Sequence, residues 1–124
     1  MTDLASTLSA LAKEEYCYLT TTGRVTARMH EIEIWFGVQD GTVYLLSGSE
    51  TSDWVKNLRR TPAVTVRIAE HSFSGRARLV QDKDEDRLAR YLLAEKYQEW
   101  EAGKTLSRWA QTALPVAIDL EPQP

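Results

Sequence analysis

The chain has 124 residues, enough for one hydrophobic core and too few for two, so we expect a single domain over residues 1–124. A hydrophobic fraction of 43%, a charged fraction of 27% and a net charge of −3 are typical of a soluble globular protein. They argue against a general nucleic-acid binder, which carries a basic field. No apolar run is long enough to span a membrane, and residues 1–30 lack the apolar centre of a signal peptide. We therefore expect a cytoplasmic protein.

The first half of the chain begins with a helix and continues as strands. Leucines spaced four and three residues apart predict a helix within residues 1–14, capped by Thr2 or Asp3. Aromatic and β-branched residues predict a strand over residues 16–22. The clearest strand signal covers residues 29–38, where side chains alternate between two faces.

The two faces of the predicted 29–38 strand differ in character. One face carries His30, Ile32, Ile34 and Phe36. The other carries Met29, Glu31, Glu33 and Trp35. Because this second face is half apolar, it suits either a subunit interface or a surface that a helix covers.

A hairpin and a second helix follow. Residues 39–41 predict a tight turn, in which Gly41 can adopt a positive φ angle. The return strand over residues 43–47 leads through a Ser/Gly loop to a helix capped by Ser52 or Asp53.

The second half of the chain completes a small barrel. Strands are predicted over residues 63–69, 73–80 and 114–120, a short helix over residues 106–112 and a tail over residues 121–124. A longer helix should begin at a capping box formed by Asp82 and Glu85 and end near Trp100. Its residues Leu88, Tyr91 and Leu92 are expected to point inward. Hairpin connections exclude a parallel doubly wound sheet, and closing a sheet removes exposed strand edges. We therefore expect an α+β protein, a small β-barrel of about six mostly antiparallel strands with helices packed outside.

Two arginines bracket the turn between the first two predicted strands. Arg24 and Arg28 offer forked donors suited to a phosphate or carboxylate, and His30 lies just beyond them. From the residues alone, solvated surface arginines, or arginines paired with Glu31 and Glu33, are the favoured interpretation.

The Ser/Gly loop is a second candidate for binding an anion. Ser47-Gly48-Ser49 leads to a helix start at Ser52, where free backbone amides attract phosphate. A routine strand-to-helix connection with a serine cap is the alternative interpretation. Asp53 would repel an anion, so we expect its side chain to point into solvent.

Other chemistry has less support. Trp54 can pack beside a planar ring and Asn57 can hydrogen-bond to one, although a tryptophan in this position is more often part of the core. His30 and His71 have no third ligand spaced to join them, so we expect no metal. Cys17, the only cysteine, lies in an apolar strand and should be buried and unreactive.

Taken in order, these segments resemble the split β-barrel flavin and deazaflavin oxidoreductases, the group that includes pyridoxamine phosphate oxidase. The deazaflavin-dependent nitroreductase branch is the closer match, over roughly residues 16–121. The segments that carry the resemblance are Thr21-Thr22-Gly23-Arg24, Thr26-Ala27, Ser47-Gly48-Ser49, Trp54-Val55-Lys56-Asn57-Leu58, Pro62-Ala63-Val64 and Leu114-Pro115-Val116-Ala117-Ile118.

The chain departs from the family pattern at four positions. Val25 stands where a basic residue is common, Ala27 where Gly is usual, and His30 where a distal Arg is usual. Glu50 replaces a neutral or basic loop residue. These departures weaken the case for a long, polyanionic cofactor tail and leave the central phosphate site in place.

The resemblance implies an oxidoreductase that uses reduced coenzyme F420, with FMN as the alternative cofactor. It would transfer a hydride to a small electron acceptor such as a quinone, an enone or a nitro compound. A non-catalytic carrier of flavin, haem or lipid on the same barrel is the alternative function. The resemblance also implies a homodimer and assigns no catalytic residue. The cofactor-binding residues that it implies are Arg24, Thr26, Arg28, His30, Ser47, Gly48, Ser49, Ser52, Trp54 and Asn57.

Overall fold

The computed structural model describes residues 3–122, so the predicted Thr2 cap and the end of the 121–124 tail lie outside the described residues. The elements in chain order are α1 (Leu4–Leu11), β1 (Cys17–Thr22), β2 (Met29–Ile34), β3 (Gly37–Gln39), β4 (Thr42–Ser47), α2 (Asp53–Arg60), β5 (Ala63–Ile68), β6 (His71–Leu79), α3 (Lys83–Tyr97), α4 (Arg108–Thr112) and β7 (Leu114–Leu120). None of the helices within residues 3–122 has the length and apolar character needed to cross a membrane.

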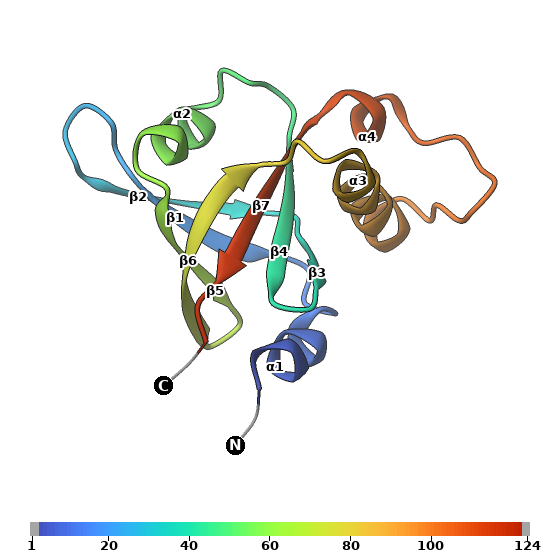
Figure 1. The fold of residues 1–124 in the computed structure, drawn as a ribbon, viewed down its shortest axis with the longest axis horizontal. Helices are drawn as coiled ribbons and strands as arrows, with labels where there is room; N and C mark the ends of the chain where they lie inside the picture. The colour runs from blue at the N-terminus through green and yellow to red at the C-terminus, as the bar shows by residue number, and fades with distance from the viewer. Residues whose placement is uncertain (1–2, 123–124) are drawn as a thin grey trace.

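All seven strands join one antiparallel sheet in the order β2-β1-β5-β6-β7-β4-β3 (Figure 1). The sheet curls into a half-barrel. Helices α3 and α4 lie together on one side of it, and α2 lies on the other side near the β1–β2 turn. This arrangement confirms the predicted α+β barrel with helices outside.

The strands β2 and β3 lie at opposite edges of the sheet, although only Trp35 and Phe36 separate them. At about 4.8 Å between strands, the edges of a flat seven-stranded sheet would be roughly 30 Å apart. The short connection reaches only about 10 Å, so the sheet must curl until its edges approach each other. The prediction of one strand over residues 29–38 is therefore wrong. Its first part pairs with β1 and its last part with β4, and between them the Phe36 side chain is fully buried.

Both faces of β4 are buried, which joins the two parts of the core. Val43 and Leu45 belong to the cluster inside the curled sheet, and Tyr44 and Leu46 belong to a second cluster beneath α3. A strand covered on both faces reads as a continuous apolar run, as VYLL does here.

Helix α3 begins as predicted and packs with a slightly different face. The Asp82 side chain accepts a hydrogen bond from the Glu85 backbone N–H at 2.9 Å, which caps the helix. The buried residues are Ala89, Leu93 and Ala94. Of the residues that we expected to point inward, Leu88 and Leu92 are half-buried and pack against the cluster beneath α3, whereas Tyr91 is half-buried and does not. Small alanines allow the helix to lie close to the sheet. The helix also ends at Tyr97 and not near Trp100.

The start of the short helix and the conformation of the β3–β4 turn also differ from expectation. The short helix begins at Arg108, two residues after the predicted start, because Ser107 caps it by accepting from the Ala110 N–H. In the β3–β4 turn the positive φ of 55° is carried by Asp40 and not by Gly41. Aspartate tolerates this left-handed conformation better than most residues with a side chain.

Candidate functional site

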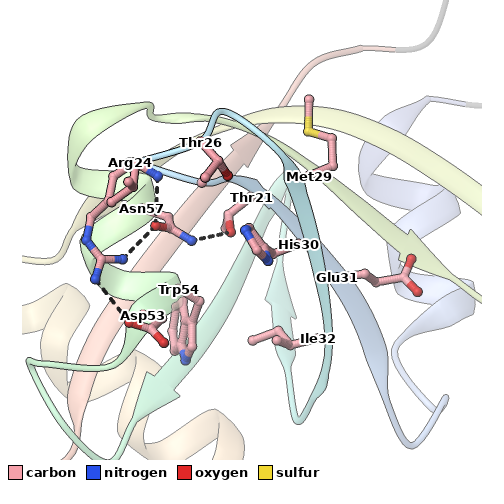
Figure 2. Close-up of a pocket in the computed structure, with 12 residues that line it drawn as sticks. Thr21, Arg24, Thr26, Met29, His30, Glu31, Ile32, Asp53, Trp54 and Asn57 are labelled. Carbon is pink, nitrogen blue, oxygen red and sulfur yellow. Dashed lines mark hydrogen bonds and ion pairs between the residues drawn. The ribbon is translucent and has the colours of Figure 1, made fainter.

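A groove of about 610 Å³ lies between the β1–β2 turn, strand β2 and helix α2 (Figure 2). Its polar wall comes from the turn and the buried side of α2, and its apolar wall comes from a tryptophan and an isoleucine. The residues that line it are Thr21, Gly23, Arg24, Val25, Thr26, Met29, His30, Glu31, Ile32, Asp53, Trp54 and Asn57.

Alternation along β2 determines which of its side chains enter the groove. His30 and Ile32 point toward α2, whereas Met29 and Glu31 sit on the rim and point away (Figure 2). The sequence had placed His30 and Ile32 on one face of this strand. The alternation of the sequence therefore already indicated that Ile32 lies beside His30 in the groove, although Ile32 was not among the predicted site residues.

Asn57 fixes the turn to the helix. Its side chain is 4% exposed, and its Oδ1 accepts from the Arg24 backbone N–H at 3.2 Å and from Arg24 Nη1 at 2.8 Å. Its Nδ2 donates to the Thr21 hydroxyl at 3.3 Å. Because these bonds join β1, the turn and α2, they hold Arg24 in place before any ligand arrives.

Arg24 also forms an ion pair that the sequence did not indicate. Its Nη2 lies 3.1 Å from Asp53 Oδ1, and the two side chains are 32% and 86% exposed. Asp53 does face solvent, as we expected, yet it still contacts the arginine. An exposed pair of this kind is weak, so a stronger anion can displace the aspartate.

Gly23 gives the turn its shape. Its N–H donates to the Arg28 carbonyl at 2.7 Å, closing the loop between β1 and β2. A Cβ at this position would lie 2.8 Å from His30 Nε2 and 3.0 Å from the Arg28 carbonyl oxygen. Only glycine lets the imidazole pack this closely over the turn. In the same turn Ala27 has a φ of 61°, the left-handed region in which glycine is favoured.

The other predicted site residues lie elsewhere. Arg28 is exposed and does not line the groove. Ser47, Gly48 and Ser49 line a separate cavity of about 320 Å³ next to α3 and α4. The structure thus brings Arg24, Thr26, His30, Trp54 and Asn57 together and separates them from Arg28 and the Ser/Gly loop.

Ser52 stabilises that loop. Its hydroxyl donates to the Ser49 carbonyl at 3.1 Å and lies 3.0 Å from the Ser47 hydroxyl. It occupies the N-cap position of α2 but makes no side-chain capping bond there. The first amides of α2 are therefore left for another acceptor, and they add positive potential at the end of the groove where Asp53 and Trp54 begin the helix.

Trp54 lies between the core and the groove. Its half-buried side chain packs against the core cluster inside the sheet, and it also lines the groove. Opposite it, Ile32 packs against the same cluster. Together they provide an apolar wall suited to a planar ring.

The strongest pKa shifts belong to residues outside the groove. On the outer face of the sheet, hydrogen bonds from Arg78 lower the pKa of the Glu85 and Asp119 carboxyls. Burial raises the pKa of the Cys17 thiol to about 12, and Cys17 is fully buried. This confirms the prediction of a buried cysteine, and a thiol with such a pKa is unreactive at neutral pH.

The curled antiparallel sheet with its groove beside α2 defines a split β-barrel protein. Solved structures show the same fold. A candidate pyridoxamine 5'-phosphate oxidase from Listeria innocua is 20% identical, with 95% of this chain and 91% of that chain covered and a TM-score of 0.64. An F420-H2 dependent reductase, FDR-A, is 17% identical, with 86% and 94% covered and a TM-score of 0.63. A domain-swapped dimer is 19% identical, with 86% and 80% covered and a TM-score of 0.64.

The family follows from the sequence match. The family model of the F420H(2)-dependent quinone reductases matches residues 3–121, and the chain belongs to this family. No curated protein matches the chain. Membership in this family identifies the protein as a reductase that uses F420H2 to reduce quinones and similar acceptors. This confirms the expected oxidoreductase and its expected cofactor.

Proposed function

We propose that the groove between β2 and α2 is the site where this reductase binds its deazaflavin. The main support is the position of Arg24, which a hydrogen bond to Asn57 holds at one end of the groove. Trp54 and Ile32 form the apolar wall of the same groove. A deazaflavin has a flat tricyclic ring joined through a sugar alcohol to a phosphate. The donors and the apolar wall therefore fit the two ends of such a molecule.

Each residue in the groove has a distinct proposed role. Trp54 and Ile32 would contact the ring and remove water from it, which restricts its orientation. Arg24, Thr26 and His30 would bind the phosphate through charge-assisted and neutral hydrogen bonds. Asn57 acts through Arg24 and is a positioning residue.

When bound, the reduced deazaflavin supplies the hydride that reduces the acceptor. A quinone takes up this hydride and one proton and leaves as the hydroquinone. The protein orients the two molecules, which explains why the groove contains no nucleophile set beside a base. Because the lining residues Val25, Met29 and Asp53 are exposed to solvent, a small acceptor can approach the ring and solvent can deliver the proton.

The test compares Arg24→Ala with Arg28→Ala. The two variants remove the same charge from one turn, but only Arg24 lines the groove. We expect Arg24→Ala to weaken F420 binding about ten-fold or more, because a charge-assisted bond contributes about 1.5–3 kcal/mol. Arg28→Ala should change it less than about three-fold, since it removes only a screened surface charge.

Binding is measured by the change in F420 fluorescence on titration, and turnover by reduction of the quinone menadione with F420H2. Equal losses in both variants, or no loss in Arg24→Ala, would contradict the assignment of Arg24 to the phosphate.

We also propose that the protein is a homodimer. Strand β2 is an edge strand, so one side of its backbone is not paired within the sheet, and its Met29 side chain is 69% exposed. The domain-swapped neighbour is consistent with this arrangement. Trp35, on the same face, is covered by Tyr97 and Trp109 and is not available. Light scattering would test the proposal, and a monomeric mass would contradict it.

A cytoplasmic location remains our proposal. Cys17 is a free thiol, which suits a reducing compartment. Recovery of the protein with the membrane or secreted fraction of cells would contradict it.

A further inference from the structure

The rim of the groove is unusually apolar. Val25 is 87% exposed and Met29 is 69% exposed, and both line the groove. Among residues 3–122 only one other large hydrophobic residue, Tyr16, is exposed, so two of the three lie at this rim. At these two positions of the rim the side chains offer neither charge nor hydrogen-bond donors.

Carboxylates complete the rim. Asp53 lies 3.1 Å from Arg24 and offsets its positive charge. Glu31 lines the groove from the β2 side, although its side chain points away from the centre (Figure 2). With two carboxylates against one guanidinium, the charged side chains of the lining carry no net positive charge, and the Asp53 carboxylate lies at the N-terminus of α2, where it offsets the positive potential of the free amides. The whole chain has a net charge of −3, which acts in the same direction.

We infer that this site selects the cofactor by its ring and phosphate and discriminates against a long oligoglutamate tail, with Val25 and Asp53 as the specificity-determining residues. The inference rests on the proposed function of the groove. Each glutamate of the tail adds a negative charge beyond the phosphate. In this chain such charges would meet the apolar Val25 and the carboxylate of Asp53, so lengthening the tail adds repulsion and no ion pairs.

Nearby basic side chains do not reverse this balance. Arg28 on the same turn and Lys56 on α2 are both exposed, and neither lines the groove. Because both side chains lie in solvent, salt at physiological ionic strength screens their charges. A tail that leaves the groove at the Arg24 end would therefore interact mainly with the rim.

The experiment titrates the protein with F420 preparations that carry short or long oligoglutamate tails and follows cofactor fluorescence at low and high salt. We expect the wild-type protein to bind the long-tailed form no more tightly than the short-tailed form. The ratio of long-tail to short-tail affinity should rise with salt, because screening weakens repulsion.

Two charge-changing variants and an uncharged control show whether the charge or the shape of a rim side chain sets the ratio of long-tail to short-tail affinity. Val25→Lys should raise the long-tail affinity about three-fold or more relative to the short-tail affinity, and Asp53→Asn should raise it about two- to five-fold, the size expected for exposed charge pairs. Val25→Gln, which has a similar length and no charge, should leave the ratio unchanged. Because Val25 and Asp53 are both exposed, these substitutions should not affect folding.

Three outcomes would overturn the inference. Tighter binding of the long-tailed form by the wild-type protein, with a ratio that falls as salt rises, would show that the rim attracts the tail. An equal change in Val25→Gln and Val25→Lys would show that charge is not the cause. Failure of every F420 form to bind would overturn the proposed function as well, which distinguishes it from the first two results.

Discussion

Asn57 provides the sharpest mutational test of how the site is held. Replacing Asn57 with alanine removes the acceptor of the Arg24 backbone N–H and of Arg24 Nη1, and the donor to Thr21. Neutral hydrogen bonds contribute about 1 kcal/mol each, and a charge-assisted bond about 1.5–3 kcal/mol. Since the Arg24 side chain is 32% exposed, water replaces part of its bond. We therefore expect the free energy of unfolding to fall by about 2–3 kcal/mol.

Cofactor affinity should fall in the same variant. Without Asn57, Arg24 must be ordered when the cofactor binds, and fixing a long side chain costs up to about 2 kcal/mol. We expect F420 affinity to decrease about ten-fold. Urea-induced unfolding measures the first effect and fluorescence titration of folded protein measures the second.

Asn57→Asp is the matched control. Aspartate keeps the acceptor for both Arg24 donors and can accept from the Thr21 hydroxyl, so stability should remain within about 1 kcal/mol of the wild type. It also places a negative charge in the groove, so F420 affinity should still fall. If Asn57→Ala unfolds at the wild-type urea concentration and binds F420 normally, the bonds at Asn57 do not hold the site.

Three further predictions concern the turn and the core. Ala27 has a φ of 61°, so Ala27→Gly should raise the free energy of unfolding by about 0.5–1 kcal/mol, and an unchanged or lower melting temperature would contradict the strain. Gly23→Ala would place a Cβ 2.8 Å from His30 Nε2, so we expect a loss of about 1–3 kcal/mol in urea unfolding, and wild-type stability would refute the tight packing. Burial lowers the pKa of Lys96 to about 8 from 10.5, so above pH 8 the unfolded chain binds more protons than the folded protein. The stability of the wild type relative to Lys96→Met should therefore rise between pH 8 and the ordinary lysine value of 10.5, and a constant difference would contradict it.

Local patterns in the sequence predicted most of the fold. The last strand was expected over residues 114–120, and β7 is found there. The break between β2 and β3 could not be predicted, because side-chain alternation continues through Trp35 and Phe36. The break follows from the curl of the whole sheet, which brings its two edges together, and no window of the sequence contains that information.

The candidate site was predicted in part for a similar reason. Arg24 and Asn57 were both expected to contact the cofactor, but their mutual hydrogen bond joins residues 33 positions apart in the chain. The backbone of the turn before Arg28 passes through the left-handed residue Ala27, which the sequence presents as an ordinary alanine. The Ser/Gly loop was assigned to the same site because it precedes α2, yet it faces α3 and α4.

A crystal structure of the protein with oxidised F420 would test the central claim most directly. We predict that the ring lies in the groove against Trp54, with its phosphate within hydrogen-bond distance of Arg24. A ring bound in the cavity beside the Ser/Gly loop, or in the cavity between α1 and the β5–β6 turn, would contradict the account.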